Sequence, residues 1–257
     1  MKIEGAEDAF LALKPAWTPP ANVRAAFTLR RGGASTGPYA SLNLGDHVGD
    51  DPRAVAANRQ QVQQALALPA QPAWLRQVHG VRLVAADQAG AEADASYTRA
   101  ANQVCAVLVA DCLPVLLCDD AGTVVAAAHA GWRGLAAGVL HHTVRELAVP
   151  PGQLMAWLGP AIGPQKFEVG AEVRAAFIAG DPHAGSHFRP AAAPDKFYAD
   201  LCGLARAQLA AAGVTRISGG HWCTATDAAS FFSHRRDGVS GRMAALIWRV
   251  EAREEIM

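Results

Sequence analysis

The sequence carries no excess charge of either sign, because its 23 basic and 23 acidic residues cancel. Bulk electrostatics therefore give no reason to expect nucleic acid or an anionic membrane as a partner. Long apolar runs are missing as well. The most apolar stretch, 104–117, is interrupted by Asp111 and Pro114 and is too short to cross a bilayer. The first ten residues contain four charged side chains, which is wrong for a signal peptide.

Cysteine is scarce, and familiar metal motifs are absent. The five cysteines are odd in number and include no Cys-x-x-Cys pair. This argues against a disulfide framework and for a reducing, cytoplasmic location. The nine histidines include no His-x-His pair of the kind common in multicopper oxidases. The His-x-Glu and Pro-Cys-x-x-Cys patterns of the usual zinc base deaminases are also missing.

Apolar residues make up 51% of the chain, which is enough to bury a sizeable core. Strands and helices are mixed without a β-α-β alternation, so an α/β or α+β fold with a mixed sheet is expected. The predicted strands are 23–29, 155–158, a bent pair within 72–84 and short strands over 214–250. The predicted helices are 51–66, 135–147, 171–179 and 199–212.

Two apolar runs flank a turn signal, Asp119-Asp120-Ala121-Gly122. If Cys118 and Thr123 close this turn, Cys112 and His129 become direct cross-strand partners. Their Cβ atoms would then lie about 4.5–5.5 Å apart. A thiolate and an imidazole at that separation can share one metal ion. The hairpin therefore predicts a metal site formed by Cys112 and His129.

Pro114 bears on the same place because it has no N–H to give to a β-ladder. It predicts a sheet edge or bulge just after Cys112, with Asp111 and Cys112 at a break in the sheet. The alternative is that Cys112 is a small core residue and His129 a structural hydrogen-bonding group. A register shift of one residue would place the two side chains on opposite faces.

His129 also begins the segment His-Ala-Gly-Trp-Arg-Gly, 129–134, which leads into a predicted helix. Free backbone N–H groups at a helix start, with Arg133 beside them, can bind a phosphate or a carboxylate. A glycine-rich turn that leaves Arg133 in solvent is an equal alternative.

Three short segments stand out along the chain. They are Gln77-Val78-His79-Gly80, Ala110-Asp111-Cys112-Leu113-Pro114-Val115 and His129-Ala130-Gly131-Trp132-Arg133-Gly134. Together they resemble the hallmarks of the laccase-domain family, also called the YfiH-like or polyphenol oxidase family. Further matching segments extend the resemblance over nearly the whole chain, and the ordered set is far more specific than any single piece. One departure is His234, which stands where an aromatic residue such as tyrosine is more usual.

The resemblance implies one domain over residues 1–257, with its core at about 24–250 and mixed sheets in an α/β/β/α arrangement. It implies a metal ion, usually zinc, held by His79, Cys112 and His129, with copper as a possible occupant in vitro. Two imidazoles and one thiolate leave one position open, as in catalytic zinc sites. Asp111 beside Cys112 is a candidate base or orienting group, and we count it with Cys112 and His129 as catalytic.

The resemblance also implies purine nucleoside chemistry. The activities are phosphorolysis of adenosine, inosine and 5′-methylthioadenosine, together with deamination of adenosine. The expected partners are purine nucleosides and phosphate, and the expected state is a monomer or a small homo-oligomer. Each polar candidate for substrate binding has an ordinary alternative as a residue bonded to backbone. The candidates are Arg59, Arg133, Arg235 or Arg242 for phosphate, and Asn43 and Gln77 for base or ribose.

Three other functions remain open, and the resemblance contributes to two of them. One is a copper-dependent polyphenol oxidase, which an older name of the family implies. Another is a hydrolase with Cys112 as nucleophile and His129 as base, a class that includes the editing of cell-wall peptide precursors. The third is a non-enzymatic module in which zinc joins the hairpin. Its fourth ligand would come from His47, Cys105, Cys118 or Cys223.

Overall fold

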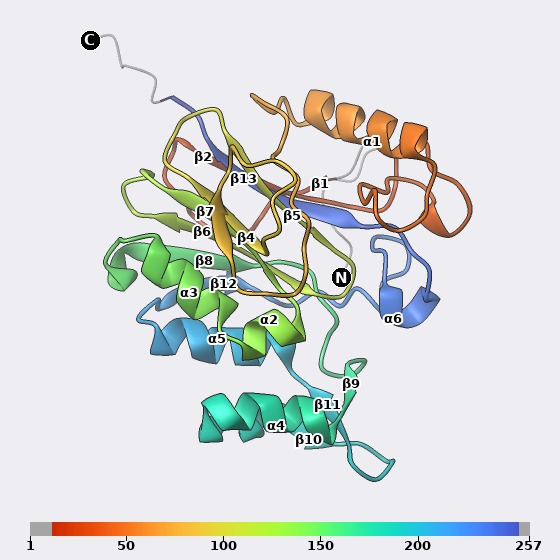
Figure 1. Cartoon of the computed structure of the whole chain (residues 1–257), viewed down its shortest axis with the longest axis vertical. Coiled ribbons are helices and arrows are strands. Elements are labelled where there is room, and N and C mark those ends of the chain that lie inside the picture. The colour runs from red at the N-terminus through yellow and green to blue at the C-terminus, as the bar shows by residue number, and fades with distance from the viewer. Residues whose placement is uncertain (1–11, 252–257) are drawn as a thin grey trace.

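A computed structural model describes residues 12–251, and the charged first ten residues lie outside this part. Its strands form two large sheets and a small third one (Figure 1). The four-stranded sheet has the order β1 (Ala12–Leu13), β2 (Val23–Thr28), β13 (Met243–Arg249), β5 (Val104–Val109). The six-stranded sheet has the order β12 (Arg216–Gly219), β8 (Leu154–Leu158), β6 (Leu113–Asp119), β7 (Val125–Ala130), β4 (Ala95–Thr98), β3 (Leu83–Ala85). The small sheet has the order β10 (Phe188–Pro190), β11 (Lys196–Ala199), β9 (Glu168–Gly170).

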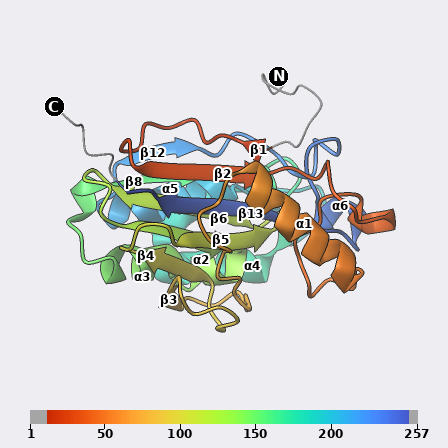
Figure 2. The same ribbon diagram turned by 90° about the horizontal axis from the view of Figure 1, so that it is seen from above.

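The helices lie outside the two large sheets (Figures 1 and 2). None of the helices in the described residues is long and apolar enough to cross a membrane. The α-helices are α1 (Pro52–Ala65), α2 (Trp132–Ala136), α3 (Val139–Glu146), α4 (Ala171–Gly180), α5 (Leu201–Ala211) and α6 (His234–Asp237). The described residues also form three short 3₁₀ helices, each between a strand and an α-helix. These are η1 (Gly37–Tyr39), η2 (Pro151–Gln153) and η3 (Pro182–His187).

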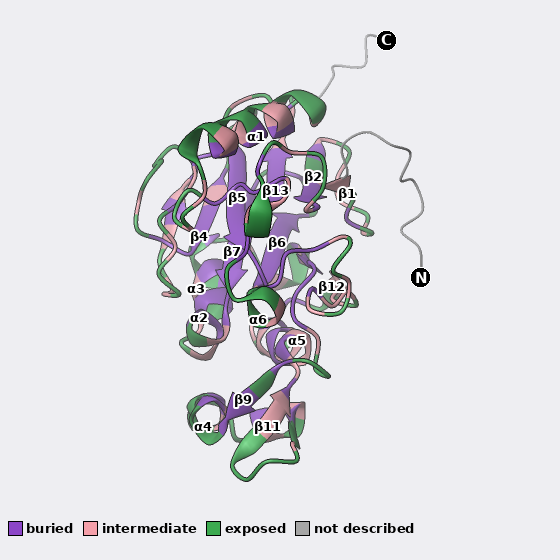
Figure 3. Cartoon of the chain, turned by 90° about the vertical axis from the view of Figure 1, so that its right-hand side faces the viewer, coloured by how far each residue is buried: buried purple, intermediate pink, exposed green. Residues whose placement is uncertain are grey.

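Strand β13 shows how the layers form, because alternate residues of a strand face opposite sides. Ala245 and its odd-numbered neighbours pack between the two large sheets, whereas Leu246 and Trp248 pack on the side of α1. Residues of α2, α3 and α5 pack on the outer face of the six-stranded sheet. Figure 3 shows the buried strands between these two helical layers. The expected mixed α/β class with α/β/β/α layers is therefore confirmed.

Several predicted elements occur within a few residues of their expected bounds. The predicted strand at 23–29 is β2, and the one at 155–158 is β8. Helix α1 begins as its sequence indicates, since the Asp51 carboxylate accepts a hydrogen bond from the Arg53 N–H and Pro52 is the first helical residue. The helices predicted at 171–179 and 199–212 are α4 and α5.

Three predictions were wrong in detail. The helix expected at 135–147 is divided into α2 and α3, because Gly138 adopts φ +92° between them. The bent strand pair expected in 72–84 is mostly loop, with one isolated bridge from Arg76 to Glu92 and only β3 as a strand. The tail does not hold short strands alone, since it includes α6 and the seven-residue β13.

The register of the β6–β7 hairpin also differs from the prediction. Cys118 pairs with Val125, two residues beyond the expected partner, and His129 pairs with Pro114. The reason is Asp119, whose carboxylate accepts hydrogen bonds from the N–H groups of Thr123 and Val124 and so holds a longer turn. A shift of two residues preserves the face on which a side chain lies.

Pro114 does not mark an edge strand, because β6 lies between β8 and β7. It stands near the start of β6, one residue before the pairing with β8 begins at Val115. The break in the sheet expected at Asp111 and Cys112 is present. There the chain leaves β5 in one sheet and enters β6 in the other, with Asp111 at φ +82°.

Candidate metal centre and active site

The loop that carries His79 is held in place by one buried carboxylate. Asp94 has no exposed surface and lies just before β4. Its two oxygens accept hydrogen bonds from the backbone N–H groups of Val78, His79 and Gly80, at 3.2, 2.9 and 2.6 Å. The backbone donors of this loop thus bind a side chain instead of a neighbouring strand, which explains why the predicted strand pair is absent.

The same carboxylate orients the second histidine. His129 is a buried residue of β7, and its Nδ1 lies 2.8 Å from an Asp94 oxygen. This pairing leaves Nε2 as the ring nitrogen available to a metal, as in the carboxylate–histidine pairs of many metal sites. The His129 backbone N–H also donates to the Asp94 carbonyl oxygen, at 2.7 Å. Asp94 therefore fixes both predicted histidine ligands.

The Asp111 side chain is used to join loops. Its carboxylate accepts hydrogen bonds from the Thr224 hydroxyl at 2.5 Å and the Ser233 hydroxyl at 3.1 Å. It also accepts the Arg235 N–H at 2.6 Å, near the start of α6. Because Asp111 is engaged on both oxygens, the geometry favours an anchoring role for the corner that carries Cys112 over a role as a free base.

The three predicted ligands come together at the end of the hairpin. Potential ligand atoms of His79, Cys112 and His129 all lie within 4.8 Å of one another. The Cys112 Sγ is 3.7 Å from the His79 Nε2. Ligands at zinc bond lengths and a tetrahedral angle are separated by about 3.5 Å. The donor set and its spacing therefore fit a zinc ion held by three protein ligands.

The electrostatics of the cluster favour the metal-binding form of the thiol. Burial alone would raise the pKa of the Cys112 thiol, yet the neighbouring His129 and His79 lower this pKa to about 6. Burial would likewise lower the pKa of His129, but the Cys112 thiolate and the Asp94 carboxylate raise it to about 9. The thiolate is the form of cysteine that binds metals and acts as a nucleophile.

No fourth member joins this cluster among residues 12–251. Cys105 and Cys118 are fully buried between the two sheets. The Cys223 thiol accepts hydrogen bonds from the Gly163 N–H and the Thr226 hydroxyl, at 3.2 and 3.1 Å. Three ligands with an open position are typical of catalytic zinc, whereas structural zinc normally has four.

The glycines of the 129–134 segment serve the metal cluster in a way that the sequence did not indicate. A Cβ atom on Gly131 would lie 2.7 Å from the His79 ring and 3.0 Å from the Cys112 Sγ. A Cβ atom on Gly134 would lie 2.7 Å from the Gly80 carbonyl oxygen. The two glycines thus allow the hairpin end to pack directly against the His79 loop.

We expect Gly131→Ala to lower the metal content of the purified protein well below that of the wild type, because the added methyl group displaces His79 or Cys112. Metal analysis after gel filtration measures this. Gly152→Ala is the matched control, since a Cβ there meets nothing within 4 Å. Equal metal content in the two variants would contradict the role assigned to Gly131.

The structure places the two amide candidates for substrate binding within the scaffold. Asn43 is buried, and its amide makes four hydrogen bonds, to Gly45 twice, to the Asp50 carboxylate and to the Arg242 N–H. This uses the full hydrogen-bonding capacity of an amide. Gln77 bonds both the N–H and the carbonyl oxygen of Leu108, as a neighbouring strand would. Both amides are therefore occupied by backbone or side-chain partners.

The arginine candidates differ in their surroundings. Arg59 stacks on Trp74, donates to the Leu44 carbonyl oxygen and lies 3.2 Å from an Asp46 oxygen. Arg133 is exposed, and its guanidinium lies over the Trp132 ring. Arg235 donates to two carbonyl oxygens of the segment before α4. Of these three, Arg59 has a carboxylate partner, whereas Arg133 and Arg235 lie over aromatic rings.

Arg242 differs from them in position, because it is close enough to the cluster for the charge of Cys112 to act on its pKa. Its Nη1 donates only to oxygens of Ser240 and Gly241, and it forms no ion pair with any described residue. Burial lowers the pKa of Arg242, and the negative charges of Cys112 and Asp111 partly oppose this shift. A partly buried cation beside the Cys112 thiolate can bind an anion.

The functional residue that sequence reasoning missed is Asp94. The available signal was a single carboxylate within a run of small residues, Ala93-Asp94-Ala95-Ser96, directly before a strand. A charged residue in such a context is rarely fully buried unless it is paired. Its partners come from two distant segments, so only the folded chain shows what the carboxylate does.

Comparison with known families gives one match over most of the chain. The model of a family described as multi-copper polyphenol oxidoreductase laccase matches residues 24–250. A purine nucleoside phosphorylase of Pseudomonas aeruginosa is 54% identical over 237 residues, which cover 92% of this chain and 97% of that protein. The purine nucleoside phosphorylase YfiH of Escherichia coli is 52% identical over 239 residues, which cover 92% of this chain and 98% of that protein.

Solved structures agree with this match. A protein of Neisseria meningitidis superposes with a TM-score of 0.90 at 51% identity, covering 93% of this chain and 99% of that one. YlmD from Geobacillus stearothermophilus superposes with a TM-score of 0.88 at 35% identity, covering 96% and 98% of the two chains. The similarity in fold therefore extends over almost the full length of each chain.

Proposed function

This chain belongs to the laccase-domain family, and on that premise we propose that it is a zinc-dependent purine nucleoside phosphorylase. The observation that carries the proposal is the three-ligand cluster of His79, Cys112 and His129. Beside it lies Arg242, which forms no ion pair with any described residue. The proposed substrates are phosphate and the nucleosides adenosine, inosine and 5′-methylthioadenosine. The names of the similar proteins support this class of substrate.

The ligand chemistry supports zinc over a multicopper centre. Within residues 12–251 one cluster of three or more metal-binding side chains occurs. Electron transfer through several copper ions would need further histidine-rich sites. A zinc ion bound here would act as a Lewis acid that polarises an oxygen atom of phosphate or substrate.

Phosphorolysis requires a positive group that holds phosphate next to the ribose. A phosphate oxygen forms a bond to C1′ while the C1′–N9 bond breaks, and the purine leaves with the bonding electrons and takes up a proton. The products are the free base and ribose 1-phosphate, or 5-methylthioribose 1-phosphate when the substrate is 5′-methylthioadenosine. Arg242 can donate from a planar guanidinium to two phosphate oxygens, which both binds and orients the attacking group.

We expect Arg242→Ala to raise the KM for phosphate by roughly 10- to 100-fold, the range for loss of a charged hydrogen bond. Zinc content should stay unchanged, because Arg242 is not a ligand. Steady-state assays at fixed adenosine and varied phosphate measure the effect, and Arg133→Ala is the control with an exposed guanidinium. A raised KM in Arg133→Ala and an unchanged one in Arg242→Ala would assign phosphate binding to the helix start instead.

A paired assay tests the proposed function. The protein is purified without a metal-binding tag, its zinc and copper are measured, and it is incubated with adenosine with and without phosphate. We expect near one zinc per chain, with adenine formed only when phosphate is present. Inosine formed without phosphate would demonstrate the adenosine deaminase activity that we include in the proposal. Stoichiometric zinc without turnover of any of the three nucleosides would refute the proposal.

The thiolate–imidazole pair also supports a second candidate, a hydrolase with Cys112 as nucleophile and His129 as base. This class would include enzymes that edit cell-wall peptide precursors. The two functions differ in their need for metal. A cysteine hydrolase should keep its activity after chelation and lose it on alkylation, whereas the phosphorylase should lose activity in the chelator and regain it with added zinc.

A further inference from the structure

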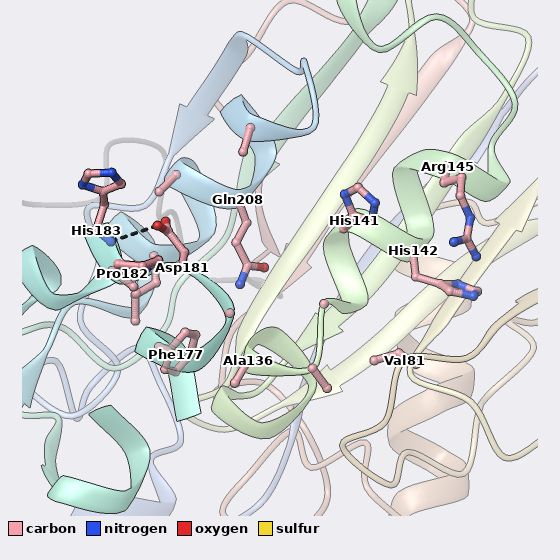
Figure 4. Close-up of a pocket in the computed structure, with 17 residues that line it drawn as sticks. Val81, Ala136, His141, His142, Arg145, Phe177, Asp181, Pro182, His183 and Gln208 are labelled. Atoms are coloured by element: carbon pink, nitrogen blue, oxygen red, sulfur yellow. Dashed lines mark hydrogen bonds between the residues drawn. The ribbon is translucent and has the colours of Figure 1, made fainter. Parts of the chain in front are cut away.

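A pocket lies on the helical side of the six-stranded sheet, away from the metal cluster, whose residues do not line it. It is formed by α3, α5, the end of α2 and the corner between α4 and η3 (Figure 4). Its volume is about 750 Å³. Sites for small organic molecules commonly fall between about 300 and 1,000 Å³. The pocket is therefore large enough to hold a molecule of that size.

The walls of this pocket are mostly apolar, and several of their polar groups can donate hydrogen bonds. Val81, Phe177 and Leu204 contribute apolar surface, together with several alanines. One carboxylate, Asp181, lines the pocket, and it already accepts a hydrogen bond from the His183 N–H at 2.9 Å. The donors are the side chains of His141, His142, His183 and Arg145.

The guanidinium of Arg145 remains available to a ligand. Its partner is the adjacent Glu146, at 3.0 Å, and both side chains are about half exposed. Exposed ion pairs of this kind contribute little, so exchange for a ligand anion costs little. Imidazole N–H groups can add further bonds to the same anion. Arg145 is the one lysine or arginine of the lining, and with the neighbouring imidazoles it offers an anionic group several hydrogen bonds at the α3 end of the pocket.

Two buried polar atoms of lining residues have no partner among the described residues, the His142 Nδ1 and the Gln208 Oε1. The Gln208 Nε2 donates to the Leu135 carbonyl oxygen at 2.9 Å, and this bond fixes the amide with Oε1 as a free acceptor. Figure 4 shows the Gln208 side chain extending between His183 and His141. Unpartnered buried polar atoms are costly, so a small turn of the Gln208 side chain that brings Oε1 to a ligand N–H or O–H would gain free energy.

We propose that this pocket is a second ligand site, which binds a small organic anion with an apolar body and at least one N–H or O–H donor. The anionic group bonds Arg145 and the imidazoles of α3, the apolar body packs against Phe177 and Leu204, and the donor bonds Gln208. A nucleoside monophosphate and a hydroxylated aromatic carboxylate share this chemistry. The proposal does not depend on the reaction at the metal cluster.

Isothermal titration calorimetry tests the site with three probes: AMP, salicylate and inorganic phosphate. The protein carries Cys112→Ala and Arg242→Ala, so that the metal cluster and the proposed phosphate site beside it are both disabled. We expect AMP or salicylate to bind at one site and inorganic phosphate to show no measurable binding, because phosphate lacks an apolar body. AMP binding without salicylate binding would identify nucleotides as the ligand class, and the reverse would identify aromatic carboxylates.

Variants locate the binding. Arg145→Glu, and separately His141→Glu, should each weaken binding by about 10-fold or more, because they place a carboxylate against the ligand anion. Both residues are exposed, so the fold should tolerate the changes. Arg53→Glu, an exposed charge reversal on α1, is the matched control and should bind as the parent does. No binding of either organic probe, or binding that the pocket variants leave unchanged, would overturn the proposal.

Discussion

Cys112→Ala should abolish zinc binding and reduce turnover of adenosine by about 10³-fold or more, since metal catalysis supplies several kcal/mol of transition-state stabilisation. The thiolate is the one anionic ligand in the cluster, and only two imidazoles remain without it. Its loss also removes a charge that raises the pKa of His129. Metal analysis and steady-state assays of the same preparation measure both effects.

Two further variants distinguish a metal-ligand role of Cys112 from a nucleophilic role and from a general effect of losing a thiol. Cys202→Ala changes a half-buried thiol on α5 that lies outside the cluster, and it should keep both zinc and activity. Cys112→Asp keeps an anionic metal ligand but removes the thiol. Partial zinc binding with partial turnover in Cys112→Asp would support a ligand role for Cys112. Full zinc binding with no turnover would instead point to Cys112 as a nucleophile.

The closeness of the three proposed ligands could be expected from the sequence. The family resemblance named all three, and the hairpin argument added a geometric reason for Cys112 and His129. The hairpin argument brought Cys112 and His129 to one face for a partly wrong reason. The predicted turn was too short, yet the error was two residues and a strand repeats every two. An error of one residue would have separated the pair. The two side chains were therefore predicted on one face because the register error was an even number of residues, and not because the register was exact.

The parts that could not be predicted depend on contacts between segments distant in sequence. Nothing near Asn43 indicates that its amide bonds Arg242 at the other end of the chain. Gly131 reads as a flexible turn residue, but its role comes from the side chain of His79, which a separate loop brings against it. Helix α2 ends early because Gly138 adopts a left-handed conformation, a choice that the apolar periodicity does not reveal.

Asp94 is the clearest case of a role that only the fold shows, and its replacement should have the second-largest effect. One oxygen accepts from the His79 N–H and faces the His129 Nδ1, and the other accepts from the Val78 and Gly80 N–H groups. Burial would raise the pKa of Asp94, but the bonds from His129 and from the backbone N–H groups outweigh it and lower the pKa. The carboxylate is therefore ionised and accepts at both oxygens.

Asp94→Asn cannot reproduce this arrangement in either orientation of the amide. If the amide oxygen faces Val78 and Gly80, the amide NH₂ donates to the His129 Nδ1. The ring proton then moves to Nε2, the atom that should bind the metal. If the amide oxygen faces His129, the NH₂ is placed against the backbone donors. We expect zinc affinity to fall by about 10- to 100-fold and the free energy of unfolding by about 1–3 kcal/mol.

Asp119→Asn separates the two effects of Asp94→Asn. Asp119 is also a buried carboxylate that accepts from backbone N–H groups, but it lies at the turn end of the hairpin, away from the cluster. Its replacement should lower the free energy of unfolding, measured by urea denaturation, while zinc affinity measured by chelator competition stays unchanged. If Asp94→Asn matched Asp119→Asn in both measurements, Asp94 would support the fold alone. A selective loss of zinc affinity in Asp94→Asn would show that the carboxylate sets the imidazole form that the metal requires.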